Sequence, residues 1–79
     1  MVIMTNIDIN KQIGIKIKLL RTKSQFSQEK LAEKADMNKN TIGLIERGEI
    51  SPSIATLYKI SNALNIELKE LVDISKIDL

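Results

Sequence analysis

Four consecutive polar residues, Asn38, Lys39, Asn40 and Thr41, stand where an amphipathic segment begins. An Asn side chain can pair bidentately with adenine, and a Lys ammonium can reach the acceptor atoms of guanine. A Thr hydroxyl can donate a hydrogen bond to a phosphate, and its methyl group can contact a thymine methyl. At a helix N-terminus such side chains could read base edges in a DNA groove. They could equally serve only as a helix cap and a solvated surface.

The composition argues against catalysis. The chain has 79 residues, with no Cys and no His. It therefore lacks disulfides, thiolate and imidazole metal ligands, and the usual general base near neutral pH. The remaining carboxylates, lysines and hydroxyls show no paired arrangement of the kind that catalysis requires. We expect no enzymatic activity, no metal and no cofactor, and no small-molecule ligand is evident.

The charge is unevenly distributed along the chain. Residues 1–48 hold nine Lys and Arg against five Asp and Glu, whereas residues 49–79 hold three against five. A polyanion would be attracted to the first part, and the second would face away from it. No signal peptide or membrane-spanning run is present, so we expect a cytoplasmic protein without membrane contact.

The polar residues must be positioned by the stretch Gln28–Arg47, which is typical of two short helices joined by a tight turn. Ser27 and Asn38 are suitable N-caps for these helices. Asp36 and Met37 are expected to form the turn between them. Any helical hairpin would bury the same apolar positions, so this pattern alone does not separate a DNA reader from a structural bundle.

The rest of the chain predicts three more helices around this pair. Asn10 is a candidate N-cap for a first helix that ends near Lys23, while Ser53 can cap a fourth helix that begins at Ile54. A short fifth helix is expected near residues 68–72. The predicted fold class is thus all-α, a compact five-helix bundle. Its parts are an N-terminal arm (1–9), a helix-turn-helix domain (10–74, with its unit at 28–47) and a C-terminal tail (75–79).

Four segments together carry a family resemblance. They read IGIKIKLLR, SQEKLAEKA, NTIGLIERG and SPSIATLYKISNALNIELKEL, at 13–21, 27–35, 40–48 and 51–71. In this order and spacing they resemble the lambdoid-phage repressor and Cro type of helix-turn-helix domain, the xenobiotic-response-element-like regulators. The resemblance implies a DNA-binding transcriptional regulator that acts as a homodimer on a near-palindromic operator of double-stranded DNA.

The resemblance also implies roles for individual residues. Positions that match base-reading sites of the family are Lys39, Asn40, Gly43 and Leu44. Positions that match contacts to the DNA backbone, or that lie at the helix N-terminus, are Gln28, Asn38, Thr41, Arg47 and Ser51. Arg21 and Glu46 match an internal salt bridge between the first and third helices. Gly43 departs from the family pattern by removing a groove-facing side chain, so we expect base reading to rest on fewer residues and partly on DNA shape.

The C-terminal apolar residues exceed what a lone short helix buries. They could close the core of the monomer, or they could form a self-complementary dimer patch, which we favour because two recognition helices would then meet successive major grooves roughly 34 Å apart. The predicted interface residues are Leu68, Leu71, Val72, Ile74 and Ile77. Within the family we favour a restriction–modification controller or autoregulator over a phage repressor or an antitoxin. A protein–protein adaptor that does not bind DNA is the rival from another class.

Overall fold

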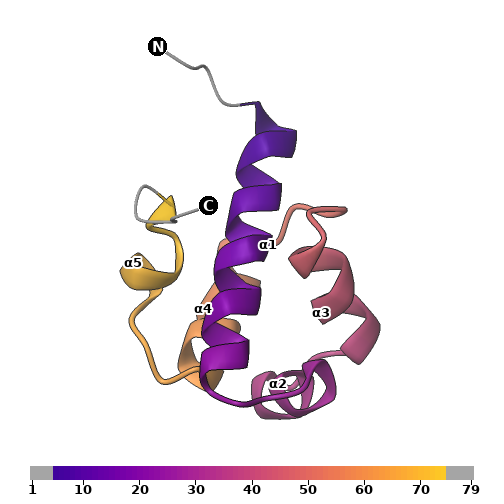
Figure 1. Ribbon diagram of the computed structural model, residues 1–79, viewed down its shortest axis with the longest axis vertical. Helices are drawn as coiled ribbons and strands as arrows, with labels where there is room; N and C mark the ends of the chain where they lie inside the picture. The colour runs from indigo at the N-terminus through magenta and orange to yellow at the C-terminus, as the bar shows by residue number, and fades with distance from the viewer. Residues whose placement is uncertain (1–4, 75–79) are drawn as a thin grey trace.

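The computed structural model describes residues 5–74, and this part of the chain is helical without strands. The helices are α1 (Asn6–Lys23), α2 (Gln28–Ala35), α3 (Lys39–Glu46), α4 (Ile54–Ala63) and α5 (Leu68–Leu71). In Figure 1, α1 runs along the molecule with α5 on one side and α3 on the other, and α2 lies at its C-terminal end. The predicted all-α five-helix bundle is confirmed.

Helix α1 starts five residues earlier than an N-cap at Asn10 predicts. Its N-cap is Thr5, whose Oγ1 accepts a hydrogen bond from the Asp8 backbone N–H at 3.1 Å, while Asp8 Oδ2 accepts from the Thr5 backbone N–H at 3.2 Å. This reciprocal capping box satisfies two N–H groups that Asn10 could not reach. Hydrogen bonds from the Thr5 hydroxyl and backbone lower the pKa of the Asp8 carboxyl. The prediction of an arm over residues 1–9 is therefore wrong for residues 6–9.

The next three helices begin at the predicted caps. The Ser27, Asn38 and Ser53 side chains accept hydrogen bonds from the backbone N–H groups of Lys30, Asn40 and Thr56, at 2.9, 2.7 and 3.1 Å respectively. The family that the sequence resembles usually has Ser or Thr as the cap of the fifth helix, so Glu67 at this position predicts a weakly started helix. Helix α5 indeed has Glu67 at its N-cap position and no side-chain cap. Its single turn depends on packing rather than on capping.

The first four helices all end in the same way. Each is followed by a residue with a positive φ, and the next residue donates its N–H back to a carbonyl five positions earlier. The residues with positive φ are Gln25 (63°), Asp36 (54°), Gly48 (73°) and Asn65 (59°). This arrangement satisfies carbonyls at the helix C-terminus and turns the chain sharply. Three of the four residues that follow, Phe26, Met37 and Ile66, pack against the core.

The core gathers side chains from all five helices. Its buried members are Ile17, Leu31, Ala32, Ile42, Ile45, Leu57, Ile60, Leu64 and Leu71. The helical spacing of Ile54, Leu57 and Ile60 predicts that all three face inward on α4. Ile54 is instead 68% exposed because it lies in the first turn, beyond the edge of the core. Leu71 is fully buried, which makes it a core residue of the monomer rather than a contact for a partner.

Candidate nucleic-acid interface

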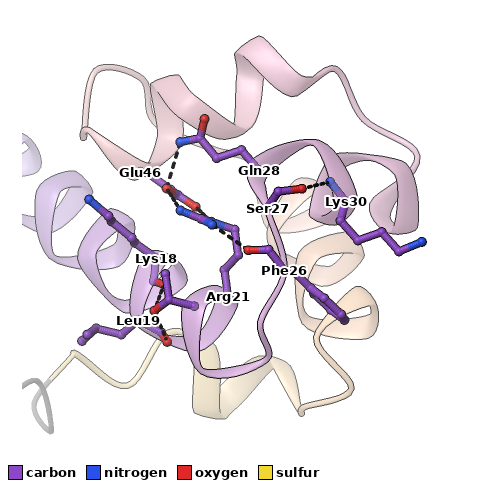
Figure 2. A network of polar contacts seen from close by, with 9 residues as sticks. Lys18, Leu19, Arg21, Phe26, Ser27, Gln28, Lys30 and Glu46 are labelled. Atoms are coloured by element: carbon purple, nitrogen blue, oxygen red, sulfur yellow. Dashed lines mark hydrogen bonds and ion pairs between the residues drawn. The ribbon is translucent and has the colours of Figure 1, made fainter.

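The orientation of α3 is set by a buried ion pair with α1. Arg21 Nε donates to Glu46 Oε2 at 2.6 Å, and Arg21 Nη2 donates to Glu46 Oε1 at 3.1 Å, so the contact is bidentate. Arg21 Nη1 also donates to the Phe26 carbonyl at 2.7 Å. Figure 2 shows the guanidinium lying between this carbonyl and the Glu46 carboxylate. The salt bridge implied by the resemblance is present, and it ties α1, α3 and the α1–α2 turn together.

Gln28 joins this network from the start of α2. Its Nε2 donates to Glu46 Oε1 at 3.1 Å, and Figure 2 shows its side chain reaching across toward that carboxylate. A side-chain amide nitrogen carries two N–H groups, so one remains for an acceptor such as a phosphate oxygen. Gln28 thus links the two helices of the unit and still presents a donor beside α3.

Close approach between α1 and α3 depends on Gly14. A Cβ at this position would lie 2.3 Å from the Ile45 carbonyl oxygen and 2.5 Å from that of Glu46. Both atoms belong to the backbone of the last turn of α3, which cannot rotate away. Because glycine is unfavourable inside a helix, its presence here predicts close packing against a neighbouring element. The structure identifies α3 as that neighbour.

Most of the predicted DNA-contacting residues lie around one shallow hollow of about 210 Å³ at the α2–α3 corner. Its lining residues are Gln28, Lys39, Asn40, Gly43, Leu44 and Arg47. They include all four positions expected to read bases and two of the positions expected to contact the backbone. Polar donors and one apolar side chain therefore share a surface, which is the combination that base edges require.

The remaining predicted contact residues do not line this hollow. Asn38 uses its side-chain oxygen to cap α3, Thr41 is partly buried, and Ser51 is exposed in the loop after α3. Asn38 can contribute to DNA binding mainly by ordering the first turn of α3. A phosphate placed near that turn would also meet the positive end of the helix dipole.

Carboxylates of the same chain accompany the two cations of the hollow. Lys39 Nζ lies 4.0 Å from Glu29 Oε2, and both side chains are mostly exposed. Arg47 Nε donates to Glu49 Oε2. Neither acidic partner was predicted from the sequence. The two-residue spacing of Arg47 and Glu49 could have suggested the second pair, whereas the first joins residues on different helices.

The predicted dimer residues are not placed together on one open surface. Leu71 is in the core and Leu68 packs against it, whereas Val72 is 37% exposed and Ile74 is partly buried. Ile77 and the tail at 75–79 lie outside the described residues. The prediction of Leu71 as an interface residue is wrong because its side chain fills the space between α5 and the rest of the core.

A second, larger hollow of about 690 Å³ lies elsewhere in the described part of the chain, lined by Lys16, Asn65, Ile66, Glu67, Lys69, Glu70 and Asp73. Residues 5–74 contain no group of three or more His, Cys, Asp or Glu side chains that could hold a metal ion. No helix within the same residues is long and apolar enough to cross a membrane.

An α2–turn–α3 unit fixed against α1, with polar side chains on the open face of α3, defines a helix-turn-helix protein. The sequence pattern of the family described as Helix-turn-helix matches residues 17–71. The chain belongs to this family of DNA-binding transcriptional regulators.

Its relatives include restriction–modification control proteins. The chain is 41% identical to the control protein C.BamHI of Bacillus amyloliquefaciens, over 94% of this chain and 91% of the relative. It is also 41% identical to the control protein C.MunI of a Mycoplasma species, over 87% and 96% of the two chains. The crystal structure of the restriction–modification controller protein C.AhdI from Aeromonas hydrophila superposes with a TM-score of 0.77 at 34% identity, covering 78% of this chain and 94% of that one.

Proposed function

We propose that this protein is the controller of a restriction–modification system and binds a near-palindromic operator as a homodimer. The observation that carries the proposal is the hollow at the α2–α3 corner, where all four positions expected to read bases lie together. The similarity to control proteins over nearly the whole chain supports the controller role. In this proposal the protein has no catalytic activity and works in the cytoplasm.

Each side chain of the hollow has a role in the proposed complex. Lys39 and Asn40 lie in the first turn of α3, where side chains of a recognition helix meet base edges in the major groove. Lys39 would donate to guanine acceptors, and Asn40 would pair with adenine. Leu44 is partly exposed one turn later and would contact a thymine methyl. Gln28 would donate its free N–H to a phosphate.

Binding to the DNA upstream of the protein's own gene tests the proposal. In a mobility-shift titration we expect sequence-selective binding, and Lys39→Ala and Asn40→Ala should each reduce discrimination by about 1–3 kcal/mol. Lys59→Ala is a matched control, because Lys59 is exposed on α4 and does not line the hollow. Binding that ignores sequence and responds equally to all three variants would contradict the proposal. No binding at all would favour the protein–protein adaptor.

The homodimer is a separate prediction. Within the described residues, Val72 is the most exposed member of the predicted patch at 37%, and the partly buried Leu68 and Ile74 also keep some exposed surface, so we place the two-fold contact there. Sedimentation velocity should show a concentration-dependent dimer, and Val72→Lys should shift it to monomer because each charge would be buried against its symmetry mate. Ile54→Lys changes an equally apolar exposed residue on α4 and should leave the dimer intact.

Two outcomes would change this view. A strict monomer at high micromolar concentration would exclude the dimer. A dimer that survives Val72→Lys but is lost in Ile54→Lys would move the contact to α4, where Ile54 and Tyr58 are 68% and 56% exposed. These two residues are four positions apart and so share one face of the helix.

A further inference from the structure

Gly43 leaves a space on the open face of α3, and the Arg47 side chain occupies it. The two residues are four positions apart, so they lie on the same face of the helix. A Cβ on Gly43 would lie 3.0 Å from Arg47 Nη1 and 3.7 Å from Arg47 Cζ and Nη2. The guanidinium therefore lies over α3, in the space next to the Cβ that any other residue at position 43 would have. The absence of a side chain at residue 43 gives Arg47 room on the groove-facing surface.

A second contact orients the same guanidinium. Arg47 Nε donates to Glu49 Oε2 from the loop that follows α3. A guanidinium has five N–H donors in a fixed plane, so a partner at Nε leaves the four N–H groups of Nη1 and Nη2 for other acceptors. The Arg47 side chain is 59% exposed, and Arg47 lines the same hollow as Lys39, Asn40 and Leu44.

We infer that Arg47 reads a guanine in the major groove, with Gly43 providing the space and Glu49 holding the guanidinium in position. The inference rests on the proposed function, and it changes the role of Arg47 from a phosphate contact to a specificity-determining residue. A guanidinium fork matches guanine O6 and N7 and is the commonest specific contact to that base. The base preference that a side chain at residue 43 would otherwise supply comes from Arg47 instead.

The charge of the pair favours a base over a phosphate. Phosphate binding draws its free energy mainly from bringing a net positive charge to the DNA backbone and releasing counterions. The Glu49 carboxylate offsets the charge of Arg47, which reduces that contribution. Base reading depends instead on the orientation of the hydrogen-bond donors. A guanidinium that is already held at Nε loses less conformational freedom when it binds a base. Glu49 is therefore a positioning residue that acts through Arg47.

The test couples one residue to one atom of one base. The operator is first obtained by selecting wild-type binders from random duplexes, and affinities are then measured by fluorescence anisotropy for every single base-pair change. We expect Arg47→Ala to abolish the preference at one G·C pair in each half-site, which corresponds to losing a difference in affinity of about 10-fold between G·C and the other base pairs. The guanine is then replaced by 7-deazaguanine, which lacks the N7 acceptor. This replacement should weaken operator binding by the wild type by a similar factor and leave binding by Arg47→Ala unchanged.

Two variants test the positioning. Glu49→Ala should reduce discrimination at the same G·C pair while raising affinity for unrelated DNA, because it frees the guanidinium and removes a negative charge. If Glu49 merely kept Arg47 away from DNA, the same variant would raise operator affinity and leave discrimination unchanged, which would overturn the positioning role. Gly43→Ala should reduce discrimination at that pair too, and should add nothing when combined with Arg47→Ala.

The result that overturns the inference differs from the result that overturns the proposed function. If Arg47 contacts a phosphate, Arg47→Ala will weaken all sequences equally and lower the slope of log K against log salt by about 1, with every base preference retained. That outcome rejects base reading and leaves the DNA-binding regulator in place. If selection with the wild type yields no preferred sequence, the proposed function itself fails. Circular dichroism of each variant, with Lys59→Ala as the control for lost charge, checks that the fold is intact.

Discussion

Replacing Glu46 with alanine is expected to lower the free energy of unfolding by about 3–5 kcal/mol, the cost of leaving one partner of a buried pair uncompensated. The Glu46 side chain is only 2% exposed and that of Arg21 only 10%, so water cannot replace the lost carboxylate. The variant would also leave Gln28 Nε2 without its acceptor. The total free energy of unfolding of a native protein is about 5–15 kcal/mol, so this variant approaches the limit of stability.

Urea denaturation at a fixed protein concentration measures this effect, with Glu33→Ala as the control. Glu33 pairs with Lys30 at 3.6 Å, but its side chain is 71% exposed, so its loss should cost less than about 1 kcal/mol. The double variant Arg21→Met with Glu46→Leu should recover much of the loss, because an apolar pair of similar volume leaves no buried charge. A Glu46→Ala variant as stable as Glu33→Ala would show that the pair contributes no more than a surface contact.

Replacing Gly14 with alanine should also be strongly destabilising, by about 2–3 kcal/mol, in the upper part of the range for overpacked interiors. Relative to glycine, alanine stabilises a helix by about 1 kcal/mol. Its Cβ, however, would meet two backbone carbonyl oxygens of α3. To relieve this contact, α1 and α3 must separate, and the recognition surface must tilt with α3. We therefore expect weaker operator binding even at temperatures where the variant remains folded.

Gly43→Ala provides a matched control, because the chemical change is the same and the surroundings differ. A Cβ at Gly43 meets only the end of the flexible Arg47 side chain, so the unfolding free energy should stay constant or rise by up to about 1 kcal/mol. Thermal unfolding followed by circular dichroism compares the two variants directly. A Gly14→Ala variant as stable as Gly43→Ala would mean that α1 can shift at little cost.

Much of the fold could be predicted because its determinants are local in the chain. Ser27, Asn38 and Ser53 cap their helices through backbone groups within three residues, which a sequence reveals directly. The start of α1 was missed because Thr5 and Asp8 form a capping box with Asp in place of the usual Glu or Gln. Ile54 was misplaced because helical periodicity gives a face but does not tell where the core ends.

In the candidate site, too, some features could be predicted from the sequence and others could not. By itself the sequence determined the helix-turn-helix unit, its caps, the polar start of α3 and, through the resemblance, the Arg21–Glu46 pair. Only the tertiary structure decided that Leu71 closes the monomer core, that Gly14 admits α3, and that Arg47 lies over Gly43 beside Glu49. The physical reason is that capping and periodicity act over a few residues, whereas burial and side-chain direction depend on which helices meet and at what distance.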